Sequence, residues 1–411
     1  MEQQLAMRRD VLAAFGAAPG VVEELLQYNE NVFNHSAIDV SHWPLPDESF
    51  VPIWRQYARE TEEAGSLLPL CKYLVQLQFP IQANISNSAD YIGATRRGLG
   101  THGMHLATGL SLREPGMCRI LVHPTTAGHM PLIVAEMRED FVALVRALAG
   151  RNEPCPVPGS MGACMVAGYN NWHRISILRE RFHASAPAHD SWGQKFAKIK
   201  TQKELYQDRF IILSSGPYSG VTAEDMGLEP EEWTGLSLVI RREHECTHYF
   251  TRRVFASMRN NLLDELIADY VGIAAAAGRF HADWLLRFLG LESDSRYREG
   301  GRLQNYRGAP PLSDSAFAVL QRLVVAAAAN LEDFDLRYIA GLQRSQVQPA
   351  LLKAMSLLTV EEMACPQAPQ ILGDSLDAAL KKMNIGDRVI AGAQETEGRK
   401  LASPNGCQRF G

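Results

Sequence analysis

The chain has 411 residues, of which 46% are hydrophobic and 21% are charged, and its formal net charge at pH 7 is −5. This composition is typical of a globular protein with a large core, and the length suggests two or three domains or one elaborated domain. Because no basic stripe stands out along the sequence, we expect no nucleic acid among the partners. We expect no membrane either, because the apolar runs are too short to span one.

The seven cysteines are odd in number and scattered, and none of them forms a C-x-x-C pair. This pattern argues against a disulfide framework and favours a reducing compartment. The N-terminus is charged where a signal peptide needs an apolar core, and apolar runs such as 323–329 are shorter than the roughly 18 residues of a membrane span. The sequence therefore predicts a soluble, cytoplasmic protein and leaves its oligomeric state open.

Residues 1–151 are interpreted as an N-terminal α+β domain. Their apolar periodicity predicts a helix over 1–30 that is interrupted near Gly16, a second helix over 51–78, a short strand over Arg119–His123, and a helix over Pro131–Leu148. Residues 152–159 contain three prolines, which cannot continue a helix, so we expect a domain boundary there.

Residues 152–234 are interpreted as a central α/β region. Residues 175–182 fit a strand or a helix equally well, and the lysine-rich segment Lys195–Gln207 favours a helix. Phe210–Leu213 is a short strand that ends in a turn rich in serine and glycine. Thr222 followed by Asp225 resembles a capping box at the start of a helix.

Residues 235–390 are interpreted as a helical domain, and residues 391–411 as a flexible tail. A long helix is predicted over Trp233–Phe255. The next helix begins after an N-cap at Asn260 or Asn261 and ends at Gly278. Shorter helices follow in the remainder of this region.

The long helix contains His244-Glu245-x-x-His248. Residues four apart lie one turn apart on a helix, so both imidazoles project from one face and can bind one Zn²⁺. Glu245, between them, is then the general base that takes a proton from a metal-activated water. A chance occurrence of the motif is the competing interpretation, and its position on a predicted helix argues against chance.

The following helix carries Glu265 and Asp269, which share one face because they are one turn apart. We expect Glu265 to be the third metal ligand, leaving a fourth position for water, as in catalytic zinc sites. We expect Asp269 to accept a hydrogen bond from the second ring nitrogen of a ligand histidine.

His244-Glu245-x-x-His248 followed by Glu265-x-x-x-Asp269 resembles the zinc metallopeptidases called gluzincins. The resemblance covers about thirty to forty residues, and Asp264 stands where thermolysin-like enzymes have asparagine. It implies an α+β, mainly helical fold, with a zincin-like active-site helix, a second ligand-bearing helix and a small mixed or antiparallel sheet. In zincins an edge strand near the site binds extended substrate, and by analogy Phe210–Leu213 is a candidate for that role.

Several other side chains are candidates for substrate or oxyanion contacts. Arg252 lies one turn after His248 and either clamps a substrate carboxylate or, the favoured alternative, pairs with a local acid. Tyr249 either lines the pocket or packs. A tetrahedral intermediate needs a hydrogen-bond donor opposite the metal. The candidates for that donor are His281, Tyr297 and Tyr306.

The leading hypothesis is a zinc-dependent hydrolase that cleaves an amide or peptide bond in a peptide or small-molecule substrate. The alternative is a metalloenzyme acting on a small molecule in a biosynthetic or tailoring reaction, with zinc or with Fe²⁺, which the same ligand set also suits. A third interpretation is a binding protein stabilised by zinc.

Overall fold

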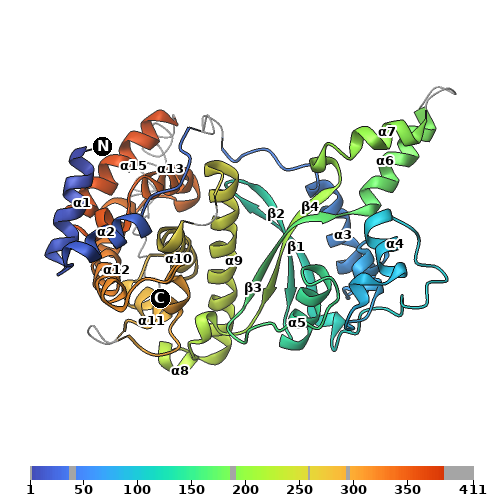
Figure 1. Ribbon diagram of the computed structural model, residues 1–411, viewed down its shortest axis with the longest axis horizontal. Helices are drawn as coiled ribbons and strands as arrows, with labels where there is room; N and C mark the ends of the chain where they lie inside the picture. Colours follow the sequence, from blue (N-terminus) through green and yellow to red (C-terminus); the bar gives the residue numbers. More distant parts are fainter. Residues whose placement is uncertain (1, 37–42, 186–190, 258–259, 293–296, 384–411) are drawn as a thin grey trace, which may run out of the picture. The chain divides into compact units, whose positions relative to one another are not determined.

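The computed structural model describes residues 2–36, 43–185, 191–257, 260–292 and 297–383. It is mainly helical and contains a four-stranded mixed sheet, which confirms the predicted α+β class (Figure 1). The chain divides into two compact units. Unit 1 comprises the described residues of Met1–Trp43 and Thr247–Gly411, and unit 2 comprises Pro44–Cys246.

This division differs from the three consecutive domains predicted above. The predicted boundary near 152 lies inside unit 2, because strands from both sides of it pair in one sheet. The N-terminal helices belong with the C-terminal helices in unit 1. The boundary between the units falls within one continuous helix, α9 (Pro230–Phe255), between Cys246 and Thr247. The predicted tail 391–411 lies outside the described residues.

The sheet of unit 2 has the strand order β1-β2-β4-β3. β1 (Cys118–Thr125) and β2 (Gly128–Ala135) form an antiparallel hairpin. β4 (Gln207–Ser214) runs parallel to β2, and β3 (Ala163–Asn170) runs antiparallel to β4 with a bulge between Ala167 and Tyr169. A parallel pair needs a long crossover, and here residues 136–206 form it and include β3.

Two predictions for this region are settled by the structure. Residues 131–135 belong to β2, and α5 begins only at Arg138 and ends at Leu148, so the first part of the predicted helix over 131–148 is wrong. This segment is an unbroken apolar run buried in a central strand, and such a run has no period that distinguishes a strand from a helix. Residues 175–182, left open above, belong to helix α6.

Helices α3 (Val51–Glu63) and α5 contact the sheet, and their apolar side chains form one buried cluster with residues such as Phe210 and Ile212 of β4. Unit 2 also contains α4 (Ala89–Arg97), α6 (Trp172–Ser185), α7 (Trp192–Ile199), α8 (Ala223–Met226) and α9 as far as Cys246. The capping box predicted for α8 is present, with Thr222 and Asp225 bonding reciprocally.

A buried carboxylate, Asp208 of β4, fastens several elements of unit 2. It accepts hydrogen bonds from Arg174 Nη1 at 2.6 Å, from Asn171 Nδ2 at 2.7 Å and from Trp54 Nε1 at 2.9 Å. Burial raises the pKa of Asp208, and the Arg174 guanidinium opposes that rise. Arg174 is itself 8% exposed, so the carboxylate is the charge that neutralises it inside the protein.

We expect Asp208→Ala to lower the free energy of unfolding by about 3–5 kcal/mol, because it leaves the Arg174 charge buried without its acid. Urea denaturation followed by circular dichroism measures this loss. Glu139→Ala is the control, since Glu139 and its partner Arg113 are both more than half exposed, and such a pair contributes less than about 1 kcal/mol. Equal losses in the two variants would contradict this account of Asp208.

Unit 1 is helical in its described part. Its helices are α1 (Glu2–Ala14), α2 (Pro19–Tyr28), the end of α9, α10 (Asn261–Ala277), α11 (Ala282–Leu289), α12 (Asp314–Phe334), α13 (Arg344–Ser356), α14 (Val360–Ala364) and α15 (Ala368–Lys382). Helix α12 contacts α2, α11, α14 and α15 and therefore lies at the centre of this unit.

The segment Asp314–Ile339, which begins with α12, is long and apolar enough to cross a membrane by length and composition. Half of its apolar window is buried inside the protein. Buried residues such as Leu320, Leu323 and Ala327 recur at the spacing of one helix face, which is the pattern of a core helix in a soluble protein.

Candidate metal centre

Helix α9, which carries the histidine motif, is anchored at the end of β4. The Arg241 guanidinium donates to the carbonyls of Gly216 and Pro217 at 2.9 and 3.1 Å, and Trp233 Nε1 donates to Val221 O at 2.8 Å. Gly162 allows this approach, because a Cβ there would lie 2.4 Å from Arg241 Nε. Acidic residues in the first turn and basic residues in the last also suit the helix dipole.

His244, His248 and Glu265 converge as the spacing predicts. Each contributes one ligand atom, and these atoms all lie within 4.8 Å of one another. His248 Nε2 lies 3.6 Å from Glu265 Oε1. Both histidines are 6% exposed, whereas the Glu265 side chain is 19% exposed. The three donors therefore form a nearly buried cluster on α9 and α10.

The ring orientation of His248 is set by Asp264. Its Nδ1 lies 2.8 Å from Asp264 Oδ2, and both side chains are buried. An ionised carboxylate can only accept a hydrogen bond, so Nδ1 donates and Nε2 keeps a free lone pair directed toward Glu265. This is the tautomer that a metal ligand needs.

His244 has a different partner, which the sequence interpretation did not include. Its Nδ1 lies 3.0 Å from the hydroxyl of Tyr218, a buried residue in the turn after β4. When Nδ1 donates to this oxygen, Nε2 of His244 is also free to bind a metal. Tyr218 is 26 residues before His244, and no periodicity or motif links the two positions.

Glu265 is held by Tyr306 of the 3₁₀ turn Arg302–Tyr306. The Tyr306 hydroxyl donates to Glu265 Oε2 at 2.7 Å, which leaves Oε1 directed toward His248. Burial raises the pKa of Tyr306 well above its ordinary value; Arg302 opposes this rise and Glu265 adds to it. Tyr306, predicted as an oxyanion contact, thus reaches the site, where its observed partner is the ligand glutamate.

The predicted role of Asp269 needs correction. Asp264, and not Asp269, occupies the Nδ1 side of His248, while Asp269 forms an ion pair with Arg302. On a helix, Asp264 and Asp269 are five residues apart and point in different directions, so only one of them can face His248. The pair between Asp269 and Arg302 instead fixes the start of the turn that carries Tyr306.

Glu245 is half-buried and follows His244 directly on α9. Among the described residues, its carboxylate has no hydrogen-bond or ion-pair partner, so it is available to bind water or substrate. Burial first, and then the charge of Glu245, raise the pKa of Cys164 on β3 to about 11. The general-base assignment of Glu245 stays a prediction.

The donor set suits zinc. Two imidazoles and one carboxylate are the protein ligands of many catalytic zinc sites, and within the described chain the cluster contains no fourth histidine, cysteine or acid. Each of the three ligands has a hydrogen-bond partner on the atom that faces away from the cluster. Such partners are the usual companions of metal ligands, because they fix the tautomer and the orientation.

Four further predicted residues have defined positions. Tyr249 is fully buried, so it packs rather than lining an open site. Arg252 is half-buried on α9, one turn after His248, and its role stays a prediction. Tyr297 donates to Gly301 O and meets Phe317 edge-on, which makes it a contact within its own loop. The fourth residue, His281, lies outside the metal centre.

His281 belongs to a separate group and not to the metal centre. It lies at the start of α11 and stacks on Trp284, with ring centroids 5.5 Å apart. Its nearest acidic neighbours are Asp283 and Glu332, and Glu332 also pairs with Arg279 at 3.3 Å. The prediction that His281 stabilises an oxyanion at the histidine motif is therefore not supported by its position.

The predicted edge strand is also corrected. Phe210–Leu213 lies in β4, which pairs with β2 on one side and with β3 on the other, so it has no open edge. The terminal strand next to it is β3. β3 carries Cys164, whose pKa is raised in part by the charge of Glu245. A short apolar strand reads the same in sequence whether it is central or at an edge.

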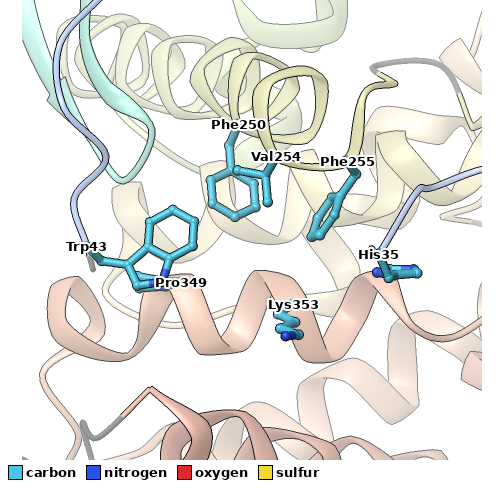
Figure 2. A pocket seen from close by; sticks show the side chains of 7 residues that line it. All are labelled: His35, Trp43, Phe250, Val254, Phe255, Pro349 and Lys353. Atoms are coloured by element: carbon cyan, nitrogen blue, oxygen red, sulfur yellow. The ribbon is translucent and has the colours of Figure 1, made fainter. Parts of the chain in front are cut away.

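A small hollow in unit 1 is distinct from the metal centre (Figure 2). It is lined by His35, Trp43, Phe250, Val254, Phe255, Pro349 and Lys353. Phe250 is two residues after His248 and therefore points to the opposite side of α9. In the described chain, this hollow contains none of the residues that the sequence predicted for the site.

Comparison with known proteins assigns the chain to a family but does not assign it an activity. No curated protein and no solved structure matches it. Residues 10–367 match a family of unknown function (DUF7005), and this match includes the histidine motif, Glu265 and Tyr306. Because the match spans most of the sequence, the chain belongs to the DUF7005 family.

Proposed function

We propose that this protein is a zinc-dependent hydrolase that cleaves an amide or peptide bond. The observation that carries the proposal is the convergence of His244, His248 and Glu265, with both imidazole Nδ1 atoms engaged by other residues. This arrangement leaves two Nε2 atoms and one carboxylate oxygen directed toward a common point, as a catalytic zinc site requires.

In this proposal the metal ion and the residues around it have separate roles. His244, His248 and Glu265 would hold a zinc ion, which would act as a Lewis acid and lower the pKa of water towards about 7. Glu245 accepts the proton of the attacking water and returns it to the leaving nitrogen, so the amine departs neutral. Hydrogen bonds with Asp264, Tyr218 and Tyr306 fix the orientation of the three proposed ligands, which are His248, His244 and Glu265 respectively.

The peptide-bond form of the proposal draws support from the sheet. β3 is a terminal strand in the described part of unit 2, and its Cys164 lies within electrostatic range of Glu245. An unpaired strand edge can bind an extended peptide through backbone hydrogen bonds. We therefore expect extended peptides, or small amides that imitate them, to be substrates.

A cytoplasmic location is part of the same proposal. All six cysteines in the described part of the chain are free thiols, and three of them are buried. Free thiols of this kind suit a reducing compartment, where disulfides are rare.

The proposal is tested by metal analysis combined with a chelation experiment. We expect the purified protein to contain one equivalent of zinc, and we expect it to hydrolyse members of a fluorogenic peptide library. Removal of the metal with a chelator abolishes this turnover, and one equivalent of zinc restores it. Iron in place of zinc, or turnover that survives chelation, would overturn the assignment.

A further inference from the structure

Helices α6 and α7 form an antiparallel hairpin in unit 2. Phe182, near the end of α6, contacts Trp192 at the start of α7, with ring centroids 5.8 Å apart. Trp172, at the start of α6, contacts Phe196 near the end of α7 at 6.4 Å. Figure 1 shows the two helices side by side, beyond the end of β3.

In the part of the hairpin that the structure describes, burial is confined to its base. The buried residues of α6 are Arg174 and Ile175, in its first turn, and the buried residue of α7 is Ile199, at its end. Trp172 Nε1 donates to Thr95 O at 2.8 Å, and Arg174 pairs with Asp208. The described residues farther along both helices are exposed or half-exposed.

Positive charge is concentrated on this hairpin. Residues 172–203 contain seven lysine and arginine residues and two acidic residues, in a chain whose net charge is −5. Six of the seven are exposed, and none of the six forms an ion pair with a described residue; they are Arg179, Arg181, Lys195, Lys198, Lys200 and Lys203. The composition of the whole chain of 411 residues does not reveal this local excess of positive charge.

The aromatic residues of α7 lie beside these charges. Trp192 and Phe196 are half-buried, and their rings stack with centroids 5.7 Å apart and an interplanar angle of 21°. The Lys200 ammonium lies 5.2 Å from the centroid of the Phe196 ring. Tryptophan and phenylalanine next to several lysines are a composition typical of helices that lie on a membrane surface.

We propose that the α6–α7 hairpin docks the protein on an anionic lipid surface. Six cations fall within the range of four to eight that is typical of segments binding acidic headgroups. Single-stranded nucleic acid is less suited, since base stacking needs open aromatic faces and those of Trp192 and Phe196 cover each other. Four of the six cations are lysines, which act as point charges rather than as forked donors to particular groups.

The test is co-sedimentation of the full-length protein with vesicles. We expect binding to phosphatidylcholine vesicles that contain about 30 mol% phosphatidylserine, and not to vesicles of phosphatidylcholine alone. Raising the salt from about 0.1 M to about 0.5 M should release the protein, because the attraction is between exposed charges. Equal binding to both kinds of vesicle would overturn the proposal.

A matched pair of variants locates the surface. Lys195→Gln/Lys198→Gln removes two exposed lysines from α7 and should weaken vesicle binding by about 10- to 30-fold. Lys381→Gln/Lys382→Gln removes two exposed lysines from α15 and should leave binding unchanged. Equal effects of the two variants would place the lipid contact elsewhere. Binding of a single-stranded RNA oligonucleotide in place of vesicles would also overturn the proposal.

This inference does not depend on the metal centre. Glu245→Gln leaves the hairpin unchanged, so that variant should bind anionic vesicles like the unaltered protein. If the hydrolase proposal were wrong, the lipid proposal would be unaffected. In the same way, a negative vesicle experiment would not bear on zinc binding.

Discussion

Glu245→Gln should retain zinc and lose hydrolysis by a factor of about 10²–10⁴, the usual contribution of a general base. Glutamine has the same shape as glutamate but does not accept a proton, so the metal ligands keep their positions while proton transfer stops. Zinc content by atomic emission and turnover of the best library peptide measure the two halves of this result.

Glu232→Gln is the matched control for Glu245→Gln. It makes the same substitution on the same helix, at an exposed position in the first turn of α9. We expect both its zinc content and its turnover to equal those of the unaltered protein. Undiminished turnover in Glu245→Gln would remove this residue from the mechanism, and loss of zinc in that variant would assign it to the ligand set instead.

The second large effect concerns metal retention. His248→Ala removes one of three ligands, and we expect the purified variant to contain no stoichiometric zinc. Asp264→Ala removes only the partner of His248 Nδ1 and should weaken zinc affinity by about 10- to 100-fold. Competition with a chromophoric chelator measures both affinities on one scale.

His102→Ala is the control for this series, because His102 is exposed and does not belong to a metal-binding group in the described chain. It should bind zinc like the unaltered protein. If His248→Ala kept one equivalent of zinc, the ligand assignment would be wrong. If Asp264→Ala had no effect on affinity, the hydrogen bond to Nδ1 would have no part in ordering the site.

The sequence predicted the convergence of the three candidate ligands because their geometry is local. His244 and His248 are one helical turn apart, and the helix period alone places both imidazoles on one face. Glu265 required one further step, a second helix that begins near Asn260, and the structure places the start of α10 at Asn261. The side chain of Asn260 does not cap that helix and instead bonds Asn31, a partner 229 residues away.

The residues that orient the ligands were decided by tertiary structure. Tyr218 reaches His244 from a turn after β4, and Tyr306 reaches Glu265 from a turn 41 residues beyond it. These contacts depend on where separate elements cross, and the periodicity of one helix carries no information about that crossing. The choice of Asp264 over Asp269 has the same cause, since both carboxylates lie on α10 and only its rotation selects one of them.

The sequence by itself therefore determined the fold class, and it predicted the two helices and the three side chains that converge in the structure. Only the tertiary structure decided that β4 is a central strand, that the N-terminal helices pack within unit 1, and that exposed cations gather on one hairpin. The physical reason is range: helix periodicity acts over a few residues, whereas strand order, ligand orientation and surface charge arise from segments far apart in the chain.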